Sequence, residues 1–125
     1  MSEIRANTIS DAAGTGPVTL TKQSAAKAWV NFDGTGTIAA RDSLNVSSLT
    51  DNGTGDYLIS YTNNMQSDDY AFSGAAAGSG NFYECWFGSA HGYPTVSNIG
   101  LGTGYDTPTI TDVTYASCTV TGDLA

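Results

Sequence analysis

Residues 27–61 read KAWVNFDGTGTIAARDSLNVSSLTDNGTGDYLISY, and this stretch decides the fold. Polar and apolar residues alternate in 29–32 and again in 56–62, as they do in strands with one buried face. Glycine-rich motifs at 34–36 and 51–56 separate the segments, and Asn and Gly tolerate the positive φ that tight turns require. The stretch therefore predicts short antiparallel strands joined by turns. Val30 and Phe32 are predicted to lie on one face of their strand. Tyr57, Ile59 and Tyr61 are predicted to lie on one face of theirs.

The same period of two continues along the chain, and no window shows a convincing helical period. The pattern predicts an all-β fold, an antiparallel β-sandwich or small barrel over residues 25–125. An extended, Gly/Ala/Thr-rich N-terminal arm is expected at 1–24, with VTLT at 18–21 as a possible short strand. The further strands are expected at 37–40, 43–46, 69–73, 81–87, 107–110 and 112–120.

Residues 88–106, GSAHGYPTVSNIGLGTGYD, are expected to form a loop of nearly twenty residues. The segment is rich in glycine and small polar residues, with aromatic residues scattered through it. Loops of this length in compact domains are usually functional or disordered. The segment is therefore the first place to look for a binding surface.

Charge is scarce and unevenly distributed. The 125 residues carry 4 Lys+Arg against 12 Asp+Glu, a formal net charge of −8, and only 13% of residues are charged. The basic residues all lie in the first third: Arg5, Lys22, Lys27 and Arg41. Nucleic acids and anionic membranes select basic surfaces, so the composition argues against both as partners. One explanation of the excess of acidic residues is that net negative charge keeps the protein soluble. The alternative is that the basic end of the chain docks on an acidic assembly while the acidic end faces outward.

Two features of the chain bear on where it is made. No apolar run approaches the ~20 residues of a membrane helix, so we expect no membrane insertion. The first residues, MSEIRANTISDAAGTGPV, lack the apolar core of a signal peptide, which predicts synthesis in a cytoplasm without secretion. Cys85 and Cys118 are expected as small buried hydrophobes, and a disulfide between neighbouring strands is the alternative.

The pieces AKAWVNFDGTGT, RDSLNVSS and TDNGTGDYLISYTNNM occur in that order within residues 25–73. They resemble a β-module of the tail-fibre and spike proteins of tailed bacteriophages. In that family a Trp-Val-Asn-Phe strand follows a stalk. A Gly-Asp-Tyr strand, a Met-containing turn and a Tyr-Ala pair come next, and they are matched here at 55–57, Met65 and 70–71. From Gly74 onward the resemblance ends.

The resemblance implies a structural virion protein, a tail-fibre or spike subunit that contacts the host cell surface. It implies a homotrimer located on the virion, made in the host cytoplasm, which docks on other virion proteins through its arm. Arg5, Lys22 and Lys27 are the docking candidates. A head fibre, decoration or adaptor protein without receptor binding is the alternative.

Sugars stack on exposed aromatic rings while Asn, Asp and Ser bind their hydroxyls, so a bacterial surface polysaccharide is a possible ligand. The candidates border or occupy the expected loop at 88–106. Trp86 and the neighbouring Phe87 can equally fill the core, and Trp29 and Phe32 belong to the core or a subunit interface. The candidate receptor- or glycan-binding residues are Trp86, His91, Tyr93, Asn98 and Tyr105.

The sequence predicts no enzyme and no cofactor. His91 is the single histidine, and no nucleophile motif accompanies it. A metal site on a trimer axis through His91 is a remote alternative. Asp51 with Asp56, and Asp68 with Asp69, offer oxygen ligands for Ca²⁺ but lack a known calcium-loop spacing. Such residues are more often turn-formers, so no metal is expected.

Overall fold

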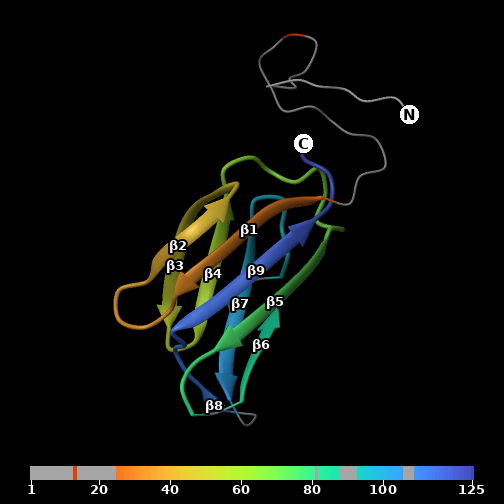
Figure 1. The fold of residues 1–125 in the computed structure, drawn as a ribbon. Coiled ribbons are helices and arrows are strands. Elements are labelled where there is room, and N and C mark those ends of the chain that lie inside the picture. Colours follow the sequence, from red (N-terminus) through yellow and green to blue (C-terminus); the bar gives the residue numbers. More distant parts are fainter. Residues whose placement is uncertain (1–12, 14–24, 81, 88–92, 106–108) are drawn as a thin grey trace, which may run out of the picture.

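The computed structural model describes residue 13 and residues 25–80, 82–87, 93–105 and 109–125, and it contains two antiparallel sheets packed face to face (Figure 1). The predicted arm at 1–24, with its possible strand at 18–21, lies outside the described residues except for residue 13. One sheet has the order β2-β1-β9-β5. The other has the order β3-β4-β7-β6, with β8 paired to β7. The β-sandwich that the sequence predicts is confirmed.

The strands are short, and their bounds differ in several places from the sequence pattern. They are β1 (Ala26–Asp33), β2 (Ala39–Leu44), β3 (Val46–Gly53), β4 (Asp56–Tyr61), β5 (Ala71–Ala77), β6 (Tyr83–Phe87), β7 (Asn98–Tyr105), β8 (Thr109–Ile110) and β9 (Tyr115–Thr121).

The core lies between the two sheets, and the alternation in β1 and β4 builds much of it. Val30 and Phe32 of β1 are 1% and 0% exposed, whereas Trp29 lies on the outer face. Phe32 meets Tyr57 of β4 edge to face across the sandwich, with ring centroids 5.1 Å apart. Burying one such aromatic side chain stabilises the fold by roughly 1.5–3 kcal/mol. Phe32 is therefore a core residue, while Trp29 is not.

β2 and β3 are almost one continuous strand, interrupted only at Asn45. Asn45 has φ 55°, and there the chain leaves the first sheet and enters the second. The sequence pattern instead divided this region at residues 41–42, because the exposed β2 has no buried face to mark it. The predicted strands 37–40 and 43–46 are wrong in their bounds.

The most important correction concerns β7. Its eight residues occupy the middle of the second sheet, within the segment expected as a loop at 88–106. Ile99, Leu101 and Thr103 are each 0% exposed and face the core, and the glycines alternate with them. The glycines suggested a loop, yet here they supply the outer face of a buried strand. Residues 88–92 and 106–108 lie outside the described part of the chain.

Other strand bounds shift by a few residues. The fifth strand was expected at 69–73, but β5 begins at Ala71 and continues beyond the predicted end through the three alanines 75–77. Strand β9 begins at Tyr115 rather than at residue 112, although Val113 is buried in the preceding segment. The expected hairpin at 51–56 is confirmed, with its turn reduced to residues 54–55.

The strands define two ends of the sandwich. We call the end at which β1 begins the arm end; it holds residues 44–46, 61–71, 93–98 and 121–125 (top of Figure 1). The opposite, distal end holds residues 33–39, 53–56, 77–80 and 109–115. The predicted arm therefore joins the domain at the arm end, and the distal end points away from that joint.

Candidate binding surface

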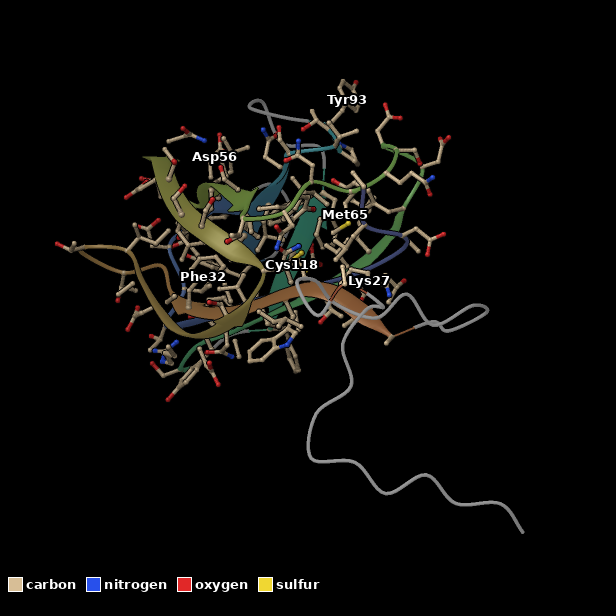
Figure 2. The ribbon with its side chains drawn as sticks, turned by 90° about the horizontal axis from the view of Figure 1, so that it is seen from above. Lys27, Phe32, Asp56, Met65, Tyr93 and Cys118 are labelled. Carbon is tan, nitrogen blue, oxygen red and sulfur yellow. The ribbon has the colours of Figure 1, made fainter. Side chains whose placement is uncertain are left out.

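The predicted receptor-binding residues do not form one surface. Tyr93, 83% exposed, and Asn98 lie at the arm end, whereas Tyr105 closes β7 at the distal end. Seen from above, the Tyr93 side chain lies at the outer rim of the molecule (Figure 2). Seven strand steps between Asn98 and Tyr105 span roughly 24 Å. His91 lies outside the described residues. A single ligand therefore cannot contact all of these residues on one small site.

Asn98 takes part in holding the arm end together. Its backbone NH donates to Thr95 Oγ1 over 3.0 Å, and its side-chain Nδ2 donates to Ser97 Oγ over 3.2 Å. The Tyr70 hydroxyl lies 3.0 Å from the carbonyl oxygens of both Asn98 and Thr95. The Asn98 side chain thus already has a partner within its own turn.

Two buried tyrosines, Tyr61 and Tyr70, pack beneath the turn at 95–98. The Tyr61 hydroxyl donates to the Tyr70 hydroxyl over 3.1 Å, and the two rings meet edge to face. Burial raises the pKa of both phenols, so both remain neutral hydroxyls that can donate. The arm end is therefore rigidly braced behind the exposed Tyr93.

Trp86 and Tyr105 are engaged by their neighbours in the second sheet. The rings of Tyr105 and Tyr83 meet edge to face at 6.0 Å between centroids. Trp86 lies over Gly104, where an added Cβ would come within 2.5 Å of the Trp86 ring. Phe87, by contrast, packs against the core from the inner face of β6. Trp86 is thus half-buried on the outer face and covers the glycine strand.

The distal loops are tied together by one carboxylate. Asp112 Oδ1 accepts hydrogen bonds from the Gly55 backbone NH over 2.7 Å and from the Tyr57 hydroxyl over 3.0 Å. The Tyr57 hydroxyl also lies 3.2 Å from the Gly34 carbonyl oxygen. Burial, followed by the bond to Asp112, raises the pKa of Tyr57. The loops that contain Gly34, Gly55 and Asp112 are distant in sequence, and these hydrogen bonds hold them together without a ligand.

Large apolar side chains are exposed at the distal end, around these loops. Phe82 is 91% exposed and Ile110 60% exposed, while Tyr115 is 53% exposed under the Arg41 guanidinium, 4.2 Å from the ring centroid. Exposed aromatic residues on a preorganised frame are typical of recognition surfaces. Sequence reasoning missed Phe82 and Ile110, although an aromatic residue directly after the glycine-rich turn at 78–80 was a usable signal.

Acidic side chains at the distal end accept hydrogen bonds that stabilise turns. Asp51 Oδ1 accepts from the Gly53 backbone NH over 2.9 Å, and Asp33 accepts from the hydroxyl and backbone NH of Thr35. These bonds to Thr35, and then the Arg41 guanidinium 3.0 Å away, hold the pKa of Asp33 below its usual value. No group of three or more His, Cys, Asp or Glu side chains suited to a metal ion occurs among the described residues.

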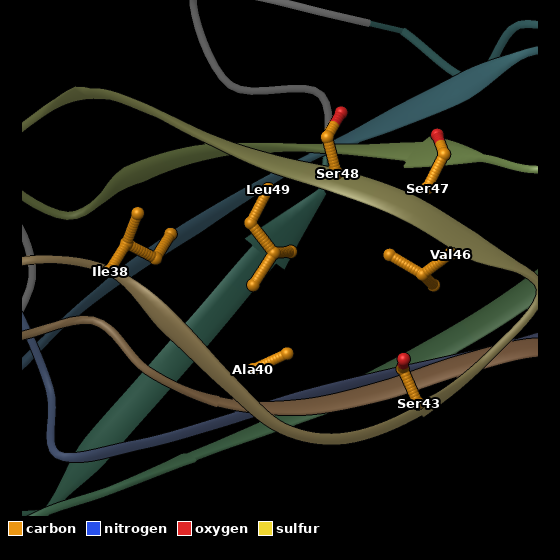
Figure 3. A pocket seen from close by; sticks show the side chains of 7 residues that line it. All are labelled: Ile38, Ala40, Ser43, Val46, Ser47, Ser48 and Leu49. Carbon is orange, nitrogen blue, oxygen red and sulfur yellow. The ribbon is translucent and has the colours of Figure 1, made fainter.

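A groove of about 190 Å³ opens between β2 and β3 (Figure 3). It lies where the chain passes from one sheet to the other, and apolar and serine side chains line it. Ligand pockets usually occupy ~300–1,000 Å³, so this groove is too small for a typical ligand. Its lining residues are Ile38, Ala40, Ser43, Val46, Ser47, Ser48 and Leu49.

Of the predicted docking residues, Arg5 and Lys22 lie outside the described residues. Lys27 is half-buried in β1 at the arm end, next to the joint with the arm. Both cysteines are free thiols; Cys118 is 2% exposed and Cys85 is half-buried. Burial raises the pKa of the Cys118 thiol to about 12, so Cys118 behaves as the buried hydrophobe that the sequence predicts.

Comparison of the chain with models of known protein families found no match, and comparisons with curated proteins and with solved structures found none. No helix long and apolar enough to cross a membrane occurs in the part of the chain that the structure describes.

Proposed function

We propose that this protein is a non-enzymatic subunit on the surface of a tailed bacteriophage virion, of the tail-fibre or spike type, which contacts the host cell. The proposal rests on the resemblance of residues 25–73 to fibre modules of such phages. The subunit is a homotrimer, and its arm at 1–24, which carries Arg5 and Lys22, docks on other virion proteins. It resides on the virion after synthesis in the host cytoplasm.

The separation of the two ends of the domain is the observation that locates the host contact within this proposal. The arm joins the sandwich where β1 begins, so a subunit held by its arm presents the distal end outward. That end exposes Ile110, close to the loops that Asp112 braces, and Phe82, which follows the glycine-rich turn at 78–80. We therefore place the host contact at the distal end, rather than at Tyr93 and Asn98 beside the arm joint.

The ligand that suits this end is a bacterial surface polysaccharide. Sugar rings stack their C–H faces on aromatic side chains such as Phe82. The serine, threonine and asparagine side chains that dominate the polar surface suit adaptable hydrogen bonding to hydroxyls. A decoration or adaptor subunit would instead bury the same residues in contacts with virion proteins.

Binding of the labelled protein to a panel of bacterial cells and their extracted polysaccharides tests the proposal. Phe82→Ser and Ile110→Ser should weaken binding, while Tyr93→Ser at the arm end serves as the matched control and should bind like the parent. The proposal is wrong if no cell or polysaccharide in the panel is bound. The assignment to the distal end is wrong if Tyr93→Ser alone removes binding.

A further inference from the structure

The outer face of β6 presents two aromatic side chains with a carboxylate between them. Every second residue of β6, from Tyr83 to Phe87, packs against the core. Because side chains alternate along a strand, Glu84 and Trp86 lie on the outer face, and Phe82 lies one step before them. Phe82 and Glu84 are exposed, Trp86 is half-buried, and the two rings are four strand steps, roughly 13 Å, apart. We call these three side chains the β6 track; it begins at the distal end and runs along the second sheet.

Glycines of β7 leave room for the Trp86 ring on the sheet. Gly102 is directly opposite Trp86, and Gly104 is opposite Glu84. The Trp86 ring lies over Gly104, where an added Cβ would come within 2.5 Å of it. One side of the ring is therefore held against β7, while the exposed part of the side chain faces outward. An aromatic ring that is already fixed by packing loses little side-chain entropy when the C–H face of a sugar stacks on it.

The surroundings of the β6 track are acidic. The chain contains no Lys or Arg after Arg41, so the strands of the second sheet carry neither. They carry instead Asp51, Asp56 and Glu84, and Asp112 lies beside them at the distal end. A polysaccharide with carboxylate or phosphate groups would meet like charges there and no lysine or arginine to pair with, and such juxtaposition of like charges excludes a partner.

We propose that the polysaccharide bound by this protein is uncharged and that its chain lies along the β6 track. This inference rests on the proposed function, because it specifies the ligand of the distal site. One sugar stacks on Phe82 and a later sugar of the same chain stacks on Trp86, since the two rings are too far apart for one sugar to cover both. Glu84 lies between them, and its carboxylate has several acceptor positions for sugar hydroxyls.

Polysaccharide extracted from a bound strain provides the probe. Anion-exchange chromatography separates it into a neutral fraction, which flows through, and an acidic fraction, which is retained. We expect the labelled protein to bind the neutral fraction and not the acidic one. The apparent Kd for the neutral fraction should be the same at low and high salt, because salt screens only interactions between charges.

Paired variants locate the ligand on the β6 track. Trp86→Ala should raise the apparent Kd for the neutral fraction about tenfold, equivalent to about 1.4 kcal/mol of binding free energy. Trp29→Ala removes the other tryptophan, which is also half-buried on an outer face but belongs to the first sheet, and should bind like the parent. Glu84→Lys should admit the acidic fraction, whereas Asp123→Lys, the same kind of change at the arm end, should not. Circular dichroism verifies that each variant is folded.

Tryptophan fluorescence gives a reading that does not require Trp86→Ala to fold. The chain has two tryptophans, so Trp29→Phe leaves Trp86 as the single emitter. The neutral fraction should change the emission of Trp29→Phe in a saturable way. It should leave the emission of Trp86→Phe, in which Trp29 is the emitter, unchanged.

Several outcomes would overturn this inference while leaving the proposed function intact. The inference is wrong if the protein binds the acidic fraction instead, if salt weakens binding to the neutral fraction, or if Trp29→Ala loses as much binding as Trp86→Ala. It is also wrong if the emission of Trp29→Phe does not respond to a neutral fraction that the protein binds. Absence of binding to every cell and extract is a different result, because it contradicts the proposed function and the inference with it.

Discussion

Asn45 is the residue on which the passage between the two sheets depends, and its replacement gives the sharpest test of the fold. Its Oδ1 accepts a hydrogen bond from the Asn63 backbone NH over 2.7 Å, and its Nδ2 donates to the Asn63 carbonyl oxygen over 3.0 Å. The side chain therefore pairs with Asn63 much as a strand neighbour would. Its own φ of 55° is a conformation that most side chains resist.

The two contributions can be separated by substitution. Asn45→Gly loses both hydrogen bonds but accepts the positive φ, and two exposed bonds at ~0.5 kcal/mol each give a loss of about 1 kcal/mol. Asn45→Ala loses the same bonds and must also hold a left-handed conformation, which adds roughly 1–2 kcal/mol. We expect Asn45→Ala to be destabilised by about 2–3 kcal/mol.

Urea unfolding followed by tryptophan fluorescence measures both variants, with equal slopes as the check on two-state behaviour. Ser48→Ala on the neighbouring β3 edge is a suitable control, because no positive φ is involved there. The reasoning is refuted if Asn45→Ala unfolds within 0.5 kcal/mol of the parent, or if the glycine variant is less stable than the alanine variant.

Three further results are expected. Gly104→Ala should destabilise the fold by about 1–3 kcal/mol in urea unfolding, because its Cβ would overlap the Thr109 backbone and the Trp86 ring. Alanine is normally more stable than glycine in a strand, so the sign of the effect is informative. An unchanged unfolding midpoint would contradict the described packing. Met65→Ala should cost about 2–4 kcal/mol because Met65 is 1% exposed in the core, whereas its exposed neighbour Gln66→Ala should cost nearly nothing. Thermal stability should fall as pH rises above about 9, because the Cys118 thiol and the phenols of Tyr57, Tyr61 and Tyr70 have raised pKa values in the folded state and the unfolded chain therefore loses its protons first. A melting temperature that stays level up to pH 11 would contradict the burial of these groups. Cys118→Ala should make the fall less steep, while Cys85, whose pKa burial also raises, still contributes to it.

The candidate binding residues were predicted wrongly as one group because residues 88–106 were taken for a loop. Tyr93 and Tyr105 are twelve positions apart, and an assumed loop at 88–106 made them neighbours. In the structure β7 runs between them and carries them to opposite ends. Glycine content alone cannot distinguish a loop from a strand whose outer face is covered. The Trp86 ring and the Thr109 backbone leave no room for a Cβ at position 104, and this close packing gives the glycine its structural reason.

The strand character of the chain, the hairpin at 51–56 and the inward faces of β1 and β4 could be predicted from the sequence alone. These features follow from contacts between residues close in sequence and from an alternation that burial of one face imposes. Three features required the folded structure: the chain changes sheets at Asn45, β7 is central, and β5 is an edge strand among the described residues. Each of these depends on which strands become neighbours, and strand pairing is set by packing between residues far apart in the chain.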